Sequence, residues 1–146
     1  MEIKLGIGLD NIIFGASQNE IENNLGKPDR IRQDEEYEEF EPMLQYNSIK
    51  TRLTFYKNHG GKLGYLRSSN PDLSYKDKKI IGKSISEAFE IFDDIPKESW
   101  QITEYDFWTD YFNEDWWIIL RCEYSEITQL ELGVPFINEE EYIWPK

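Results

Sequence analysis

The stretch IFGASQNEI at residues 13–21 is repeated in pattern by IIGKSISEA at residues 80–88. Each stretch places an apolar pair before a glycine, and then a serine followed three residues later by a glutamate (Ser17 and Glu20, Ser84 and Glu87). A serine and a glutamate at this spacing form a capping box, the pattern that begins a helix, and in the second stretch either Ser84 or Ser86 can be the cap. Because a repeat fixes the number of structural units, the sequence predicts a single domain over residues 1–146, built from two related units at about residues 1–70 and 71–146.

Strand patterns follow each predicted helix. Apolar residues alternate with polar ones through residues 44–57, and residues 116–124 (WWIILRCEY) are rich in aromatic and β-branched side chains. The sequence His-Gly-Gly at residues 59–61 and polar residues at 125–126 predict hairpin turns after these strands. We therefore expect an α+β fold, in which two tandem units, each a short helix plus antiparallel strands, form one twisted sheet with both helices on one face.

The net charge of the chain indicates which classes of partner it can bind. The chain carries 16 basic and 29 acidic side chains, for a net charge of −13, which disfavours a direct nucleic-acid binder and favours a basic protein partner. Residues 98–146 hold 2 basic and 12 acidic side chains, whereas residues 50–83 hold nine cations and two acids. The second half thus carries most of the negative field, and one surface of the first half is expected to be basic.

Cysteine and histidine usage argues against catalysis. Cys122 is the one cysteine and His59 the one histidine, so neither a disulfide nor a His-based triad or metal site can form within the chain. Cys122 lies among apolar strand residues, where a buried structural thiol is expected. We expect a non-enzyme without cofactor or metal. With no secretory signal and no stretch of about 20 apolar residues, it is expected to be cytoplasmic and away from membranes.

Two acidic segments are candidate binding elements. Residues 98–117 interleave carboxylates with aromatic rings and contain no basic residue, which indicates either a protein-binding face or core rings beside a solvated acidic loop. Residues 34–41 hold six acids in the equivalent loop of the first unit, either as steering charge or as a solvated loop. The predicted partner contacts are Asp106, Trp108, Asp110, Tyr111, Glu114, Asp115 and Trp116, with Glu35, Glu36, Glu38 and Glu39 as steering charge.

A strand ending in Phe14-Gly15, the helix start at Ser17, and Leu-Gly-Lys-Pro-Asp at residues 25–29 resemble the helix-plus-sheet repeat of the β-lactamase inhibitory proteins and of the small outer-membrane assembly lipoproteins. The lipoproteins carry a signal peptide and a lipidated cysteine, which this sequence lacks. The inhibitor resemblance implies two tandem copies whose concave sheet grips another protein with aromatic and acidic side chains.

The overall character is also similar to that of bacterial toxin immunity proteins. An acidic, aromatic-rich chain without catalytic residues suits an inhibitor that neutralises a basic toxin, such as a nuclease, by occluding its substrate surface. Two alternatives remain at this point. A hydrolase could use a pair of carboxylates, although nothing selects a pair from 29 acids, and a structural or assembly adaptor could pair with a like subunit.

Overall fold

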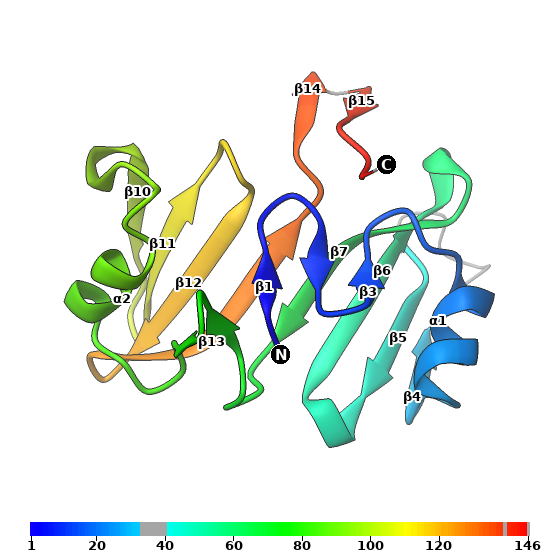
Figure 1. Cartoon of the computed structure of the whole chain (residues 1–146), viewed down its shortest axis with the longest axis horizontal. Coiled ribbons are helices and arrows are strands. Elements are labelled where there is room, and N and C mark those ends of the chain that lie inside the picture. The colour runs from blue at the N-terminus through cyan, green and yellow to red at the C-terminus, as the bar shows by residue number, and fades with distance from the viewer. Residues whose placement is uncertain (33–40, 139, 146) are drawn as a thin grey trace.

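A computed structural model describes residues 1–32, 41–138 and 140–145. Across these residues the fold is mostly β and is built on one eight-stranded antiparallel sheet (Figure 1). From edge to edge its strands are β10 (Trp100–Glu104), β11 (Thr109–Asn113), β12 (Ile118–Glu123), β13 (Glu126–Gly133), β7 (Lys62–Ser68), β6 (Thr51–Tyr56), β5 (Met43–Tyr46) and β4 (Arg30–Arg32). Strands β7 and β13 pair at the centre, where Leu66 lies opposite Leu132.

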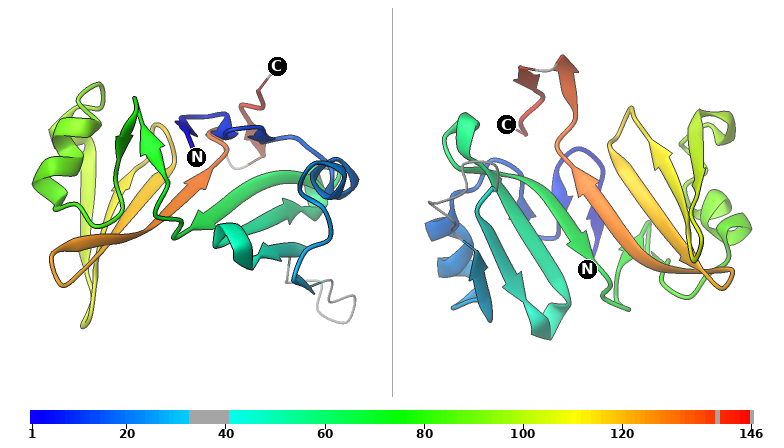
Figure 2. Two further views of the ribbon diagram at one scale, coloured as in Figure 1. Left: turned by 60° about the horizontal axis from the view of Figure 1, so that its bottom comes forward. Right: turned by 180° about the vertical axis from the view of Figure 1, so that it is seen from behind.

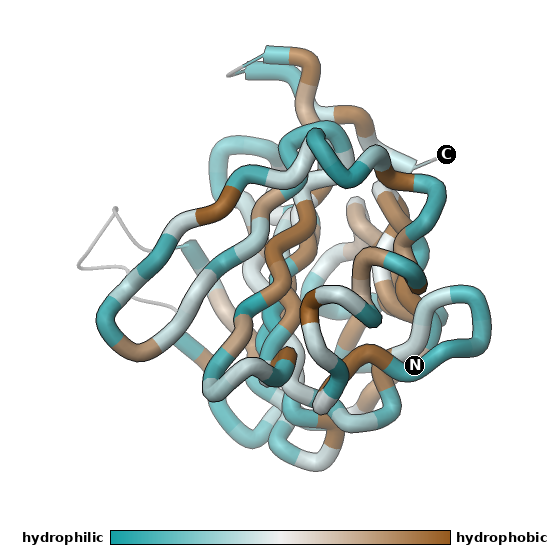
Figure 3. The backbone as a smooth tube through the Cα atoms, turned by 90° about the vertical axis from the view of Figure 1, so that its left-hand side faces the viewer, coloured by the Kyte–Doolittle hydropathy of each residue, from teal (hydrophilic) through white to brown (hydrophobic). Residues whose placement is uncertain are grey.

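The sheet has one apolar and one polar face, because successive side chains of a strand point to opposite sides. Every second residue of β6 and β12 is buried, and the residues between them are half-buried. Leu53, Phe55, Leu66, Leu120 and Leu132 are fully buried members of one core cluster on the apolar side. Figure 3 shows hydrophobic stretches along the inner strands, while most of the outer turns are hydrophilic.

Short strands cover the middle of the apolar face. β1 (Ile3–Lys4), β2 (Gly8–Leu9) and β3 (Ile12–Ile13) form a three-stranded meander, and β8 (Ser74–Tyr75) pairs with β9 (Lys78–Lys79) beside it. Ile3, Leu9 and Ile12 of the meander are buried in the core cluster. A Cβ on Gly8 would lie 1.9 Å from the carbonyl oxygen of Ile12, so only glycine permits this tight meander.

The two predicted helix starts are confirmed. α1 (Gln18–Leu25) begins after Ser17, whose Oγ accepts the Glu20 amide at 3.1 Å, and α2 (Ile85–Ile91) begins after Ser84. At α2 the capping box is reciprocal, because Ser84 Oγ accepts the Glu87 amide and a Glu87 carboxylate oxygen accepts the Ser84 amide, each at 3.2 Å. Three single turns of 3₁₀ helix complete the helical content of the described residues: η1 (Asn47–Ile49), η2 (Lys57–His59) and η3 (Lys97–Ser99).

The predicted α+β fold class, with tandem helix-plus-strand units and both helices covering one face, is wrong. The described chain is dominated by strands, and its two α-helices are short and lie at opposite ends of the long sheet (Figure 1). The physical reason is helix length: α1 buries only Ile21 and α2 only Ala88 and Ile91. Two helices of this size cannot cover eight strands, so β1–β3 and β8–β9 complete the layer.

The C-terminal hairpin docks through aromatic rings. β14 (Phe136–Asn138) and β15 (Glu141–Tyr142) lead to a cluster in which Tyr142 lies 4.7 Å from the His59 ring and Trp144 lies 5.7 Å from Tyr142. His59 therefore has a packing role in the turn that was predicted at residues 59–61, where Gly60 and Gly61 adopt positive φ. Among the described residues, neither α-helix is long and apolar enough to span a bilayer.

Candidate functional site

Exposed aromatic rings gather where the β10–β11 loop meets the β12–β13 turn. Phe107 is 79% exposed, Tyr124 95% and Tyr105 50%. They border a cavity of about 480 Å³ that is also lined by the start of α2 at Ser84–Ser86, called here the α2 wall, and by the half-buried Tyr111 and buried Cys122, called here its floor. We call this cavity and its bordering rings the aromatic groove.

Local backbone geometry presents these rings. Glu104 pairs with Thr109 at the end of the hairpin, and the Tyr105 amide donates to the Trp108 carbonyl at 2.8 Å, so the loop between them is tight. In the facing turn, Tyr124 and Ser125 adopt φ of 51° and 67°, the conformation of a two-residue hairpin connection. Side chains at such tips point into solvent, which explains the exposure of Phe107 and Tyr124.

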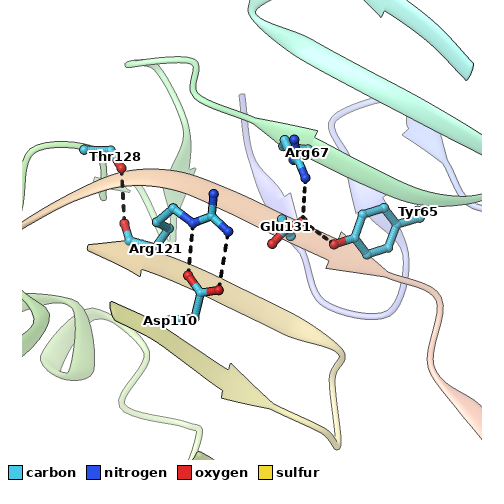
Figure 4. A network of polar contacts seen from close by, with 6 residues as sticks. All are labelled: Tyr65, Arg67, Asp110, Arg121, Thr128 and Glu131. Carbon is cyan, nitrogen blue, oxygen red and sulfur yellow. Dashed lines mark hydrogen bonds and ion pairs between the residues drawn. The ribbon is translucent and has the colours of Figure 1, made fainter. Parts of the chain in front are cut away.

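Arg121 is held beside the groove by a ring and a carboxylate. Its guanidinium lies 4.8 Å from the Trp108 ring centroid and donates to Asp110 at 3.1 and 3.4 Å (Figure 4). The Arg121 and Asp110 side chains are 22% and 13% exposed, and the hydrogen bond to Asp110 raises the pKa of Arg121. Tyr105 stacks on Trp108 at 4.9 Å. Trp108 and Asp110 are therefore both engaged inside the molecule.

The structure separates the predicted partner contacts into two groups. Asp106, Trp108 and Tyr111 line the aromatic groove. Glu114, Asp115 and Trp116 follow the other end of β11, whose five residues span about 16 Å. All three are exposed, Trp116 at 41%. Asp110 faces Arg121 instead of solvent, and Glu35, Glu36, Glu38 and Glu39 lie outside the described residues.

Sequence reasoning missed two of the most exposed rings, Phe107 and Tyr124, as contacts. Tyr124 was assigned to the predicted strand at residues 116–124, but the observed β12 ends at Glu123. A turn signal at Ser125 alone did not reveal that Tyr124 occupies the first turn position. The pairing of Cys122 with Ile127, which leaves four residues for the hairpin end, is visible only in the structure, so no sequence signal marked Tyr124 as a turn residue.

Two titratable groups, Cys122 and Tyr111, lie at the floor of the groove. Burial, followed by the field of Asp110, raises the pKa of Cys122 to about 11, so the thiol stays protonated at neutral pH. Burial, Cys122 and Glu104 likewise raise the pKa of Tyr111. No group of three or more histidine, cysteine, aspartate or glutamate side chains suited to a metal ion occurs within the residues that the structure describes.

Comparison with known proteins supports the fold alone. No protein-family model and no curated protein matches the chain. A crystal structure of an extracellular protein containing a SCP domain, from Bacillus anthracis strain Ames, matches 82% of this chain with a TM-score of 0.54 and 12% identity. The match covers 43% of that protein, so this chain spans less than half of its length. The resemblance to β-lactamase inhibitory proteins stays a prediction.

Proposed function

We propose that this protein is a non-catalytic inhibitor that binds a cationic segment of another protein in the aromatic groove. The observation that carries the proposal is the exposure of Phe107 and Tyr124 around a cavity of about 480 Å³. Large exposed rings beside a hollow are typical of protein-binding sites, because aromatic anchors supply most of the binding energy. Because Phe107 and Tyr124 are not packed into the core, both rings are available to a partner.

Charge at the groove favours a cationic occupant. Asp106 lines the groove, and Glu104 is close enough to the Tyr111 hydroxyl to raise its pKa. Neither carboxylate forms an ion pair with another described residue, whereas Lys83 is the exposed cation bordering the α2 wall. The local balance is therefore negative, as it is over residues 98–146 as a whole.

Arg121 provides an internal example of this recognition. Within the molecule, its guanidinium lies over the Trp108 ring and bonds to the Asp110 carboxylate. A ring face and a carboxylate together are a favourable environment for arginine, through cation–π attraction and charge-assisted hydrogen bonds. Phe107, Tyr124 and Asp106 offer the same combination to a lysine or arginine of a partner.

The test begins with a displayed peptide library in which cationic and acidic peptides are equally represented. We expect enrichment of peptides that carry lysine or arginine beside apolar residues, and their affinity is then measured by fluorescence anisotropy. Asp106→Lys should weaken binding about tenfold or more. The matched control is Asp115→Lys, which changes the net charge equally at the other end of β11 and should alter affinity by less than about twofold.

A second pair of variants tests the rings. Replacing Phe107 and Tyr124 by serine should abolish measurable binding, while the same change at Ile137 and Ile143, two exposed apolar residues of the C-terminal segment, should leave it intact. Equal loss in both pairs, or selection of acidic peptides, would refute the groove as the site. Far-ultraviolet circular dichroism confirms that each variant is folded.

In its more specific form, the proposal is an immunity-type inhibitor whose partner is a basic toxin, such as a nuclease. Support comes from the net charge of −13, because carboxylates can compete with substrate phosphates for lysine and arginine. A toxin encoded by the neighbouring gene should be neutralised by this protein and not by Asp106→Lys. If no basic protein is encoded there, the specific form is wrong while the peptide experiment still judges the groove.

A further inference from the structure

The polar face of the sheet holds a row of closely placed cations. Register pairs join Arg30 to Gln45, Gln45 to Arg52, Arg52 to Arg67, and Arg67 to Glu131 across four neighbouring strand pairs. Directly opposed residues share one face of a sheet, so the three arginines lie on the side away from the core. Seen from that side in Figure 2 (right), the long strands lie in front of the N-terminal meander.

This row has more positive than negative charge. Like charges directly opposite one another destabilise a sheet, and Arg52 stands directly opposite Arg67. Burial, and then Arg67, Arg32 and Arg30, lower the pKa of Arg52. Glu131 offsets part of this charge, since it bonds to Arg67 at 3.4 Å and also accepts the Tyr65 hydroxyl (Figure 4). Arg52 forms no ion pair or hydrogen bond with the residues that the structure describes.

A cavity of about 240 Å³ opens beside Arg52 and Arg67. We call it the polar-face pocket; its charged and amide lining residues are Gln45, Asn47, Lys50, Arg52, Arg67 and Gln129. Lys50 is brought there by the end of η1, where it adopts a left-handed backbone conformation. The Gln45 side-chain amide donates to Asn47 Oδ1 at 2.8 Å, and the Asn47 backbone N–H donates to Asp29 Oδ2 at 2.7 Å. The side-chain N–H groups of Asn47 remain for another acceptor.

Two buried donors of the lining residues lack acceptors. Arg67 Nε and Gln129 Nε2 have no hydrogen-bond partner among the described residues, and one buried acceptor of the lining, Gln45 Oε1, also has none. Buried donors in folded proteins are almost always paired, so an unpaired one calls for an explanation. Together with the unpartnered guanidinium of Arg52, these two donors outnumber the unpaired acceptor Gln45 Oε1, and a surplus of donors is the environment that an oxyanion requires.

We propose that the polar-face pocket binds the phosphoryl group of a small molecule, held by Lys50, Arg52 and Arg67. A phosphoryl group carries up to two negative charges and several acceptor oxygens, and arginine forks match its geometry. The volume lies below the range of pockets that take drug-sized ligands, so a small ligand fits. A long nucleic acid would meet the net charge of −13, which repels it. The proposal is independent of the aromatic groove.

The test is calorimetric titration with inorganic phosphate and with glycerol phosphate, at an ionic strength held constant with sodium chloride. Both should bind, and Arg52→Gln should weaken them about tenfold or more. This variant removes a repulsive charge, so the free protein should unfold at the same or a higher temperature, which separates lost binding from lost folding. The control Lys78→Gln removes one charge from β9, on the apolar side, and should bind as the natural sequence does.

The ligands also distinguish the source of the phosphoryl group. Tighter binding of glycerol phosphate than of free phosphate supports a phosphorylated small molecule, whereas equal binding supports a site for the ion itself; both sustain the phosphoryl assignment. Acetate or a glutamate-rich peptide binding as tightly as phosphate would overturn it. Equal loss in Arg52→Gln and Lys78→Gln, or no heat of binding with either phosphate compound, would overturn the site.

Discussion

Gly133→Ala should destabilise the fold by about 3 kcal/mol, because the added methyl group has no room. A Cβ at Gly133 would lie 2.0 Å from Cδ1 of Trp117 and 2.7 Å from its Nε1. Trp117 packs edge-on against Phe112 at 4.8 Å and Phe136 at 5.0 Å. Overpacking costs about 2 kcal/mol and the two weakened ring contacts about 1 kcal/mol each. Restricting the unfolded chain returns about 1 kcal/mol.

The assay is urea unfolding followed by far-ultraviolet circular dichroism, since fluorescence would respond to movement of Trp117 itself. The same loss can be checked by thermal unfolding, where it lowers the Tm of a chain of 146 residues by about 9 °C. The matched background is Trp117→Ala, in which the obstructing ring is gone and Gly133→Ala should stabilise the protein by up to about 1 kcal/mol. An equal cost in both backgrounds would refute the steric explanation and place the effect in the backbone of β13.

Three further predictions follow from local contacts. Asp110→Asn should cost about 2 kcal/mol in urea unfolding, because Arg121 loses its charged acceptor; an unchanged midpoint would contradict this. Alkylation of Cys122 in the native protein at pH 8 should be about 100-fold slower than alkylation of a thiol of ordinary pKa, and its rate should rise about tenfold per pH unit up to about pH 11. A rate that does not depend on pH would contradict the raised pKa. Ser84→Ala should cost about 1 kcal/mol by removing the acceptor of the Glu87 amide, and Ser84→Asp should restore it.

Short-range signals in the sequence predicted local structure well. The helix starts at Ser17 and Ser84 depend on contacts within four residues, and the hairpin turns predicted at residues 59–61 and 125–126 depend on local backbone conformation. The second turn begins one residue earlier than predicted, at Tyr124. The layer that covers the sheet depends instead on how much area two short helices leave uncovered. That quantity is not encoded in any local pattern, and the predicted fold class was wrong for this reason.

Asp110 shows the same limit at the candidate site. Residues 98–117 contain no cation, so Asp106, Asp110, Glu114 and Asp115 were all predicted to contact a partner. Arg121 lies eleven residues after Asp110 but directly opposite it in the β11–β12 register. Asp110, a predicted partner contact, is therefore paired with Arg121. Strand register also places Asp115 at the far end of β11 from Asp106. The pairing of strands in the hairpin, more than the composition of the segment, determines which carboxylates lack an ion pair and can contact a partner.

Net charge and local charge answer different questions about partners. At physiological ionic strength the field of a charge falls off over about 8 Å, so a large partner responds to the sum over a surface while a small ion responds to the few side chains nearest it. The chain can therefore repel a polyanion with its net charge of −13 and still attract a single phosphoryl group at Arg52 and Arg67. A basic protein and a small anion would then be recognised by separate sites, one built on the β10–β11 and β12–β13 loops and the other on β5–β7.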